Sequence, residues 1–248
     1  LMNYPKIKFK ISKNKEFEVF KEFLNYYKSD QERLFNWLLA PHKTFKKGFW
    51  NKGISNTQII KLAKKYIDEY YKLHAKDLNN DNIVTGTSWG KKEKKFYNLI
   101  DEIFDHYKWP KGKYTGYLTV WGIYPRYIKE KTFCFPYKHK IKKYVLTVIA
   151  HEMLHFIFYS YLFNKYPKYK NKKYGMLIWH SSEIFNSLVQ KSRPWVKLFE
   201  LKPRNYPEHN EIIKKLDETW KSERKIPAFF SEAFPVIKKW VDGISVNP

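Results

Sequence analysis

The sequence predicts an α+β fold in which a small mixed sheet packs on one buried helix, with additional helices before and after it. The segment 144–163 is almost entirely apolar and contains neither Gly nor Pro, which predicts a buried helix. The segments 114–124 and 131–136 are rich in β-branched and aromatic residues and are interrupted by Gly and Pro, which predicts strands. Most of the remaining chain has apolar residues at helical spacing, which predicts amphipathic helices.

The length and composition indicate one large folded domain. The chain has 248 residues, of which 43% are hydrophobic and 19% aromatic, enough to form a core. We therefore expect a single domain over residues 1–248. It divides into a helical N-terminal part at about 13–108, a core at about 114–192 and C-terminal helices at 207–241.

The N-terminal elements follow from hydrophobic periodicity. Ile7, Phe9 and Ile11 alternate with polar residues, as in a strand with one buried face. Asp30 and Asn56 stand where a helix N-cap is favoured. The predicted elements are a strand over 7–11, helices over about 15–27, 30–39, 57–76 and 91–107, and a polar loop over 77–82.

The C-terminal elements are predicted as helices separated by polar or proline-containing segments. Residues 164–175 are strongly basic and are expected to form a loop. Ser181 or Ser182 is expected to cap the next helix, which ends before Pro194. Pro207 suits the first turn of another helix, which runs to about residue 221. A last helix is predicted at about 228–241, with a kink at Pro235.

Chemically useful side chains concentrate in the predicted buried helix, where residues 151–155 form the motif H-E-x-x-H. Residues four apart share a helix face, so His151 and His155 can point their imidazoles at one place. That is half of a zinc site, with Glu152 beside it as a candidate general base. Burying these polar groups is costly unless they find partners. The alternative is that they hydrogen-bond inside the core and bind no metal.

A catalytic zinc needs a third protein ligand in addition to water, and two residues after His155 can supply it. We favour Glu183 over His180, because Glu183 is expected in the first turn of a helix, where it is rigidly held and favoured by the helix dipole. The alternative is a first-turn acid that binds no metal. Asn186 and Ser187 lie one turn later and can orient a ligand. The alternative for both is plain helix surface.

With these residues the chain resembles the zincin metallopeptidases, and most closely the gluzincin branch, whose pattern is H-E-x-x-H followed by a Glu on a later helix. The resemblance runs from about residue 114 to the helix of Glu183. It implies a zincin-like core at 114–192, Zn²⁺ held by His151, His155 and Glu183, and Glu152 as the general base. The chain departs from the thermolysin pattern at Ser187, where an Asp would assist the histidine.

A second resemblance is to the SprT-like proteases, whose third ligand is a His shortly before an acidic and an aromatic residue. His180, Glu183 and Phe185 match that arrangement loosely. This family acts on DNA-associated proteins, so the resemblance implies a use for positive charge.

The net charge of +24, from 48 basic against 24 acidic residues, raises the question of an anionic partner. Nearly all the basic residues are lysine, whereas arginine is the usual residue for bidentate contacts with bases and phosphates. We therefore favour a lysine-coated surface with weak, nonspecific binding of nucleic acid. A nonenzymatic basic nucleic-acid-binding protein is the alternative to an enzyme.

Several residues complete the expected mechanism. In zincins a substrate peptide adds to a sheet edge, and here that strand would be 114–124 or 131–136. An oxyanion donor is also needed. Its candidates are Tyr174, Tyr206, His209 and Arg193. The remaining histidines are expected at the surface: His42, His74, His106 and His139.

The expected compartment is the cytoplasm. The single cysteine, Cys134, excludes an intrachain disulfide, and the first residues show no signal-peptide pattern. The segment 144–163 is about as long as a membrane span, but the mean hydropathy of the chain is −0.65. We therefore expect a soluble zinc metallopeptidase that acts on a peptide or protein substrate, with no membrane partner. The sequence leaves its oligomeric state open.

Overall fold

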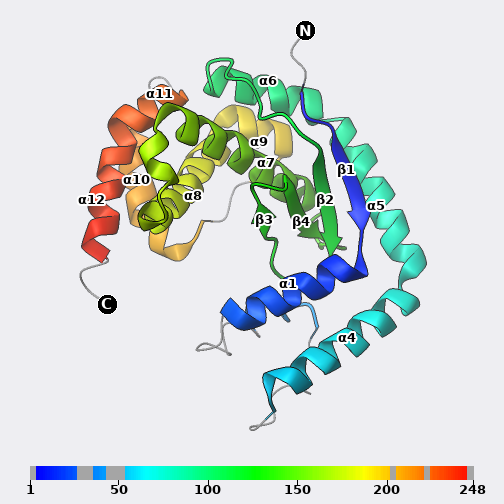
Figure 1. Cartoon of the computed structure of the whole chain (residues 1–248). Coiled ribbons are helices and arrows are strands. Elements are labelled where there is room, and N and C mark those ends of the chain that lie inside the picture. Colours follow the sequence, from blue (N-terminus) through cyan, green and yellow to red (C-terminus); the bar gives the residue numbers. More distant parts are fainter. Residues whose placement is uncertain (1–3, 27–35, 43–53, 202–204, 221–223, 245–248) are drawn as a thin grey trace. The chain divides into compact units, whose positions relative to one another are not determined.

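The computed structural model describes residues 4–26, 36–42, 54–201, 205–220 and 224–244 (Figure 1). The chain forms two compact units. The sheet unit comprises Pro5–Trp89 and Gly112–Ile149, and the helical unit comprises Leu1–Tyr4, Gly90–Lys111 and Ala150–Pro248. The mixed α+β class is confirmed, since many helices accompany one small mixed sheet. The single domain over 1–248 stays a prediction.

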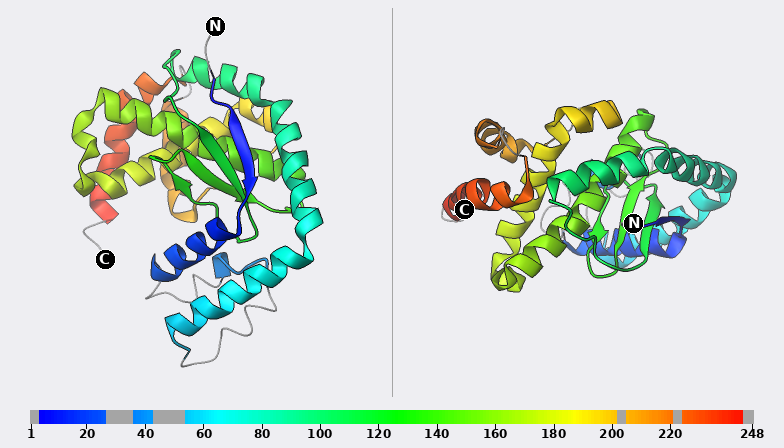
Figure 2. Two further views of the ribbon diagram at one scale, coloured as in Figure 1. Left: turned by 45° about the vertical axis from the view of Figure 1, so that its right-hand side comes forward. Right: turned by 90° about the horizontal axis from the view of Figure 1, so that it is seen from above.

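The sheet has four strands in the order β1-β2-β4-β3 (Figures 1 and 2). Strands β1 (Ile7–Ile11), β2 (Tyr114–Thr119) and β4 (Thr132–Pro136) run parallel, and β3 (Arg126–Tyr127) is antiparallel to β4. The three longer strands were predicted, although β2 ends at Thr119. The expectation that β2 forms the substrate edge is wrong, because β2 pairs with β1 and β4 on its two sides. Strand β4 pairs with β3 only at Thr132 and Phe133, so the expectation for β4 stays a prediction.

Two helices of the sheet unit agree closely with the sequence. Helix α1 spans Lys13–Tyr26 and α4 spans Asn56–Leu73. The N-cap of α4 is Ser55 rather than Asn56, and a capping box with Gln58 explains the difference. The helix predicted from Asp30 lies mostly outside the described residues.

Helix α5 (Ala75–Gly90) corrects the prediction of a polar loop at 77–82. Its buried residues are only Leu78, Thr85 and Trp89, too few to give a clear helical pattern in the sequence. The helix packs against β1 at Gly86, where an added Cβ would lie only 3.3 Å from the Phe9 ring. Tertiary contact has thus overridden weak local preference.

A buried glutamate ties α1 to the end of β2. Glu16 is 2% exposed. Its carboxylate accepts hydrogen bonds from the Val120 backbone N–H at 2.9 Å, the Thr119 hydroxyl at 2.9 Å and the Tyr71 hydroxyl at 3.1 Å. Burial raises the pKa of Glu16 to about 7, although these three donors act to lower it. No feature of the sequence had distinguished this acid from surface glutamates.

His42 was predicted at the surface, and this is wrong. It is 6% exposed; its Nε2 lies 2.8 Å from the Val120 carbonyl oxygen and its Nδ1 lies 2.6 Å from the Tyr66 hydroxyl. Burial lowers its pKa. Both ring nitrogens therefore have protein partners, as expected of a structural histidine. His106 is exposed as predicted, and His74 and His139 are partly exposed.

The motif helix α7 runs over Lys142–Lys165, as the sequence predicted. Residues up to Ile149 belong to the sheet unit and those from Ala150 to the helical unit. By length and composition α7 could cross a membrane, and 83% of its most apolar window is buried within the structure. Core helices of soluble proteins meet the same criterion, so the cytoplasmic location stays a prediction.

The other elements of the helical unit mostly follow the predicted order. They are α6 (Glu93–Ile103), η1 (Pro167–Lys170), η2 (Lys172–Tyr174), α8 (Gly175–Lys191), α9 (Arg193–Phe199), η3 (Pro207–His209), α10 (Asn210–Thr219), α11 (Ile226–Ala228), η4 (Phe229–Ala233) and α12 (Phe234–Ile244). The last three follow one another without a break, and η4 is a π-helical turn. A π-helical turn thus precedes Pro235, which lies at the start of α12, and the kink expected at this proline stays a prediction.

Helix α8 begins earlier than predicted. Ser181 and Ser182 are buried inside it and do not cap it; the Ser182 hydroxyl donates to the Trp179 carbonyl oxygen at 2.9 Å. Glu183 consequently lies in the third turn, so the argument from the helix dipole does not apply. The apolar residues 176–179 extend the helix backwards from the serines.

An aromatic core holds α7 against α8 and the C-terminal helices. The rings of Phe158 and Phe185 have centroids 5.1 Å apart, and Phe229 and Phe230 lie 5.0 Å from Phe185 and 5.7 Å from Phe158, respectively. All four are buried. Edge-on and stacked aromatic contacts of this kind are directional, so they fix the separation of the two helices that carry the candidate site.

Candidate metal centre

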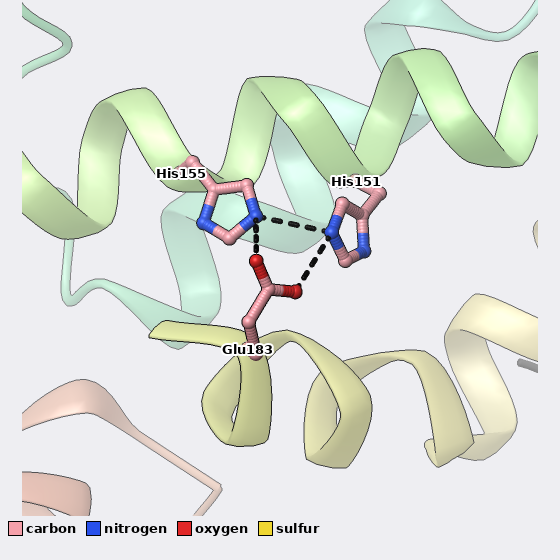
Figure 3. Close-up of side chains that lie close together, drawn as sticks. All are labelled: His151, His155 and Glu183. Atoms are coloured by element: carbon pink, nitrogen blue, oxygen red, sulfur yellow. Dashed lines mark hydrogen bonds and ion pairs between the residues drawn. The ribbon is translucent and has the colours of Figure 1, made fainter. Parts of the chain in front are cut away.

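Helix α7 presents the two motif histidines from successive turns (Figure 3). Their Nε2 atoms lie 3.0 Å apart. The His155 side chain is fully buried, whereas His151 is 24% exposed. One histidine is therefore enclosed by protein, and the other faces the side from which a small molecule can enter.

Helix α8 directs Glu183 at the same point. Its Oε2 lies 3.3 Å from Nε2 of His151 and its Oε1 lies 3.4 Å from Nε2 of His155 (Figure 3). The carboxylate is 3% exposed. One ligand atom from each of the three residues falls within 4.8 Å of the others, so the group can hold a metal ion.

The three side chains are close enough to face one small cation. Ligand atoms at zinc distances of about 2.0–2.2 Å in a tetrahedral arrangement lie roughly 3.3–3.5 Å from one another. The two contacts of Glu183 are of this length but come from different oxygens of its carboxylate, and the Nε2 atoms of the two imidazoles are closer, at 3.0 Å. Two imidazoles and a carboxylate also suit other divalent transition metals.

Glu152 follows the first ligand histidine and is 5% exposed. Its Oε1 lies 4.0 Å from Nε2 of His151. It therefore lies beside Nε2 of His151, while the group that could hold a metal ion consists of His151, His155 and Glu183.

Two amide side chains of α8 hold the histidines in place. Nδ2 of Asn186 donates to the His151 carbonyl oxygen at 3.0 Å and lies 3.1 Å from Nε2 of His155. Nε2 of Gln190 lies 2.6 Å from Nδ1 of His151. Asn186 was a sequence candidate and Gln190 was missed, although its position seven residues after Glu183 places it on the same helix face. Ser187 is buried, so neither it nor Asn186 is plain helix surface.

His180 has a different neighbour. Its Nδ1 lies 2.8 Å from Nε2 of His209, and the rings of Trp179 and Trp240 pack against it. Burial and the charge of His209 lower the pKa of His180 to about 4, although the charges of Glu208 and Glu183 oppose the shift. Burial likewise lowers the pKa of His209. The pair is therefore neutral at pH 7.

The group that could hold a metal ion thus contains Glu183 and does not contain His180. Phe185, the third residue of the SprT-like pattern, lies in the aromatic core against Phe158 and Phe229. The residues of that pattern are consequently not gathered at one point.

The four candidates for an oxyanion donor occupy different surroundings. Tyr206 and His209 pack around Trp179, Tyr174 packs against Tyr169, and Arg193 is exposed at the start of α9.

Comparison with known proteins identified no relative. No protein-family model matches the sequence, no curated protein matches it, and no solved structure matches the fold. The resemblance to zincins rests on the motif and on the positions of the three candidate ligands.

Proposed function

We propose that the protein is a zinc-dependent metallopeptidase, a hydrolase with a zincin-like fold in which His151, His155 and Glu183 hold Zn²⁺. The observation that carries the proposal is the convergence of two imidazole Nε2 atoms and one carboxylate at 3.0–3.4 Å. Three protein ligands would leave a fourth coordination position for water, as catalytic zinc sites require. A buried cluster that binds no metal is the alternative.

When bound, zinc acidifies a water and polarises the substrate carbonyl. Glu152 would serve as the general base that takes a proton from the attacking water. The same carboxyl group then gives the proton to the leaving amine nitrogen as the C–N bond breaks.

The proposed substrate is a peptide or protein segment in extended conformation. Such a segment can extend the sheet by pairing with an edge strand. The edges are β1, with five residues, and β3, with two. Strand β1 is the longer of these two edges.

Two other functions have weaker support. A SprT-like protease needs His180 as a ligand, but His180 contacts His209. A nonenzymatic nucleic-acid-binding protein has only the net charge of +24 in its favour. Nonspecific contact of nucleic acid with the lysine-rich surface is compatible with the peptidase proposal.

The proposal is tested by peptide cleavage with wild type and the Glu152→Gln variant. A peptide library read by mass spectrometry is suitable, since it presumes no cleavage preference. Glutamine keeps the size of Glu152 but cannot serve as a base, so activity should fall by a factor on the order of 10² or more while zinc is retained. Glu208→Gln, at an exposed position of the same unit, is the matched control. Equal cleavage by Glu152→Gln and wild type would contradict the mechanism.

A further inference from the structure

We infer that Gln190 is the positioning residue of His151, and that its amide can support either tautomer of that imidazole. The inference rests on the proposed binding of zinc through Nε2 of His151. It assigns to a neutral amide the supporting role that a carboxylate or a backbone carbonyl commonly has beside a metal-binding histidine.

The placement of Gln190 is the first argument. Glu183, Asn186 and Gln190 lie at helical spacing on one face of α8, and all three contact the motif histidines of α7. Gln190 is 4% exposed, and its amide approaches the ring nitrogen of His151 that faces away from Glu183. One helix face therefore supplies a candidate ligand and the partner of a second ligand.

The chemistry of imidazole is the second argument. A neutral histidine carries its proton on one nitrogen, and the other has the lone pair. In the structure the Gln190 atom nearest to Nδ1 is the amide nitrogen, a donor that suits the tautomer with a proton on Nε2. Zinc bound at Nε2 needs the other tautomer, whose Nδ1–H must find an acceptor.

An amide meets both requirements. A half-turn about its last side-chain bond exchanges the NH₂ group for the carbonyl oxygen, which then accepts from Nδ1–H. A carboxylate at this position could only accept, and a hydrocarbon could do neither. Asn186 is not free to take over this role, because its amide nitrogen donates to the His151 carbonyl oxygen and lies against His155.

Three variants separate these properties. Gln190→Leu removes donor and acceptor at similar volume and should weaken zinc binding by 10- to 100-fold, roughly the usual effect of losing an outer partner of a ligand histidine. Gln190→Glu restores the acceptor and should bind zinc at least as tightly as wild type. Gln58→Leu is the control at a second glutamine, since Gln58 is exposed and caps α4 in the sheet unit; the zinc affinity of this variant should be unchanged.

The experiment titrates the full chain with Zn²⁺ against a chromogenic chelator, and records side-chain ¹⁵N NMR shifts of His151 with and without zinc. We expect the proton of His151 to move from Nε2 to Nδ1 when zinc is added to wild type, and to reside on Nδ1 throughout in Gln190→Glu. The wild-type spectra need no variant, so the inference stays testable if Gln190→Leu fails to fold.

Failure of the inference is distinguishable from failure of the proposed function. Zinc binding by wild type with unchanged affinity in Gln190→Leu would overturn the role of Gln190 alone. A wild-type His151 with its proton on Nδ1 before and after zinc addition would overturn the exchange between tautomers. Absence of zinc binding by wild type would overturn both the inference and the proposed site.

Discussion

Two buried glutamates, Glu16 in the sheet unit and Glu183 in the helical unit, show how differently one residue type can be used. Both are 2% exposed. Glu16 accepts hydrogen bonds from two hydroxyl groups and one backbone N–H. Glu183 places each carboxylate oxygen near the Nε2 of a different histidine. Burial is thus the same in the two cases, and only the neighbours differ.

The neighbours decide the role. Hydroxyl and amide donors satisfy a carboxyl group without any further ion, so Glu16 serves as a structural link. Imidazole nitrogens are common metal ligands, and two of them facing one carboxylate can provide three of the four ligands of a zinc ion. An acid is therefore a candidate ligand because of what it faces, and its burial alone carries no such information.

The largest expected effect is a loss of zinc binding on removing Glu183, with no such loss on removing Glu16. Glu183→Ala should weaken zinc binding by a factor on the order of 10² or more and abolish cleavage, because it removes one of three ligands. Glu16→Ala should leave the affinity for zinc unchanged even though it removes a buried partner of three donors. Chelator competition measures both.

His180→Ala is the control for Glu183→Ala, because it alters the same helix outside the metal-binding group. A greater loss of zinc from His180→Ala than from Glu183→Ala would reverse the assignment. It would return the protein to the SprT-like interpretation.

The free energy of unfolding should depend on pH because of Glu16. Its pKa is raised from 4.5 to about 7 in the folded protein, so the folded state binds the proton more tightly. The stabilisation is fully present below pH 4.5 and is lost as pH rises through 7, by on the order of 3 kcal/mol. Glu16→Gln should flatten this dependence in urea unfolding. A slope that persists in the variant would assign it to other groups.

His180 should change the free energy of unfolding with pH in the opposite direction to Glu16, over a largely overlapping pH range. The pKa of His180 falls from 6.5 to about 4, so its neutral form stabilises the fold above pH 6.5 and this contribution is lost as pH falls toward 4. His180→Asn, which keeps a polar group near Nδ1, should reduce the loss between these values. Urea unfolding at pH 6.5 and pH 4.5 measures the decrease in the free energy of unfolding. A decrease as large in His180→Asn as in wild type would contradict the contribution of His180.

The smallest effect expected concerns the lysine-rich surface. Any binding of DNA should show no sequence preference and should weaken steeply as salt is raised, because it depends on counterion release. Fluorescence anisotropy with two unrelated duplexes at several salt concentrations tests this. Tight, sequence-selective binding at physiological salt would instead favour the nonenzymatic alternative.

The sequence predicted those parts of the molecule whose signal is local. The apolar segment and the four-residue spacing of its histidines predicted α7 and the shared face, and alternation predicted β1. The position of Glu183 was predicted although the start of its helix was not. The face of the helix on which Glu183 lies follows from helical spacing, so it is predicted correctly even when the predicted start of the helix is wrong by several residues.

Features that depend on distant contacts could not be predicted from local patterns. Helix α5 has few apolar residues and packs against β1. Glu16 and His42 are ordinary polar residues in the sequence, and only their partners in other elements explain their burial. Gln190 was missed for the same reason, since its importance lies in its contact with His151.

Zinc content is the most direct test that the helical unit contains a metal site. Elemental analysis of extensively dialysed wild type should find about one zinc per chain, and His151→Ala should hold far less, because a three-ligand site that loses an imidazole binds weakly. Glu16→Gln should match wild type. Equal zinc in wild type and His151→Ala, or none in either, would contradict the assignment of His151, His155 and Glu183.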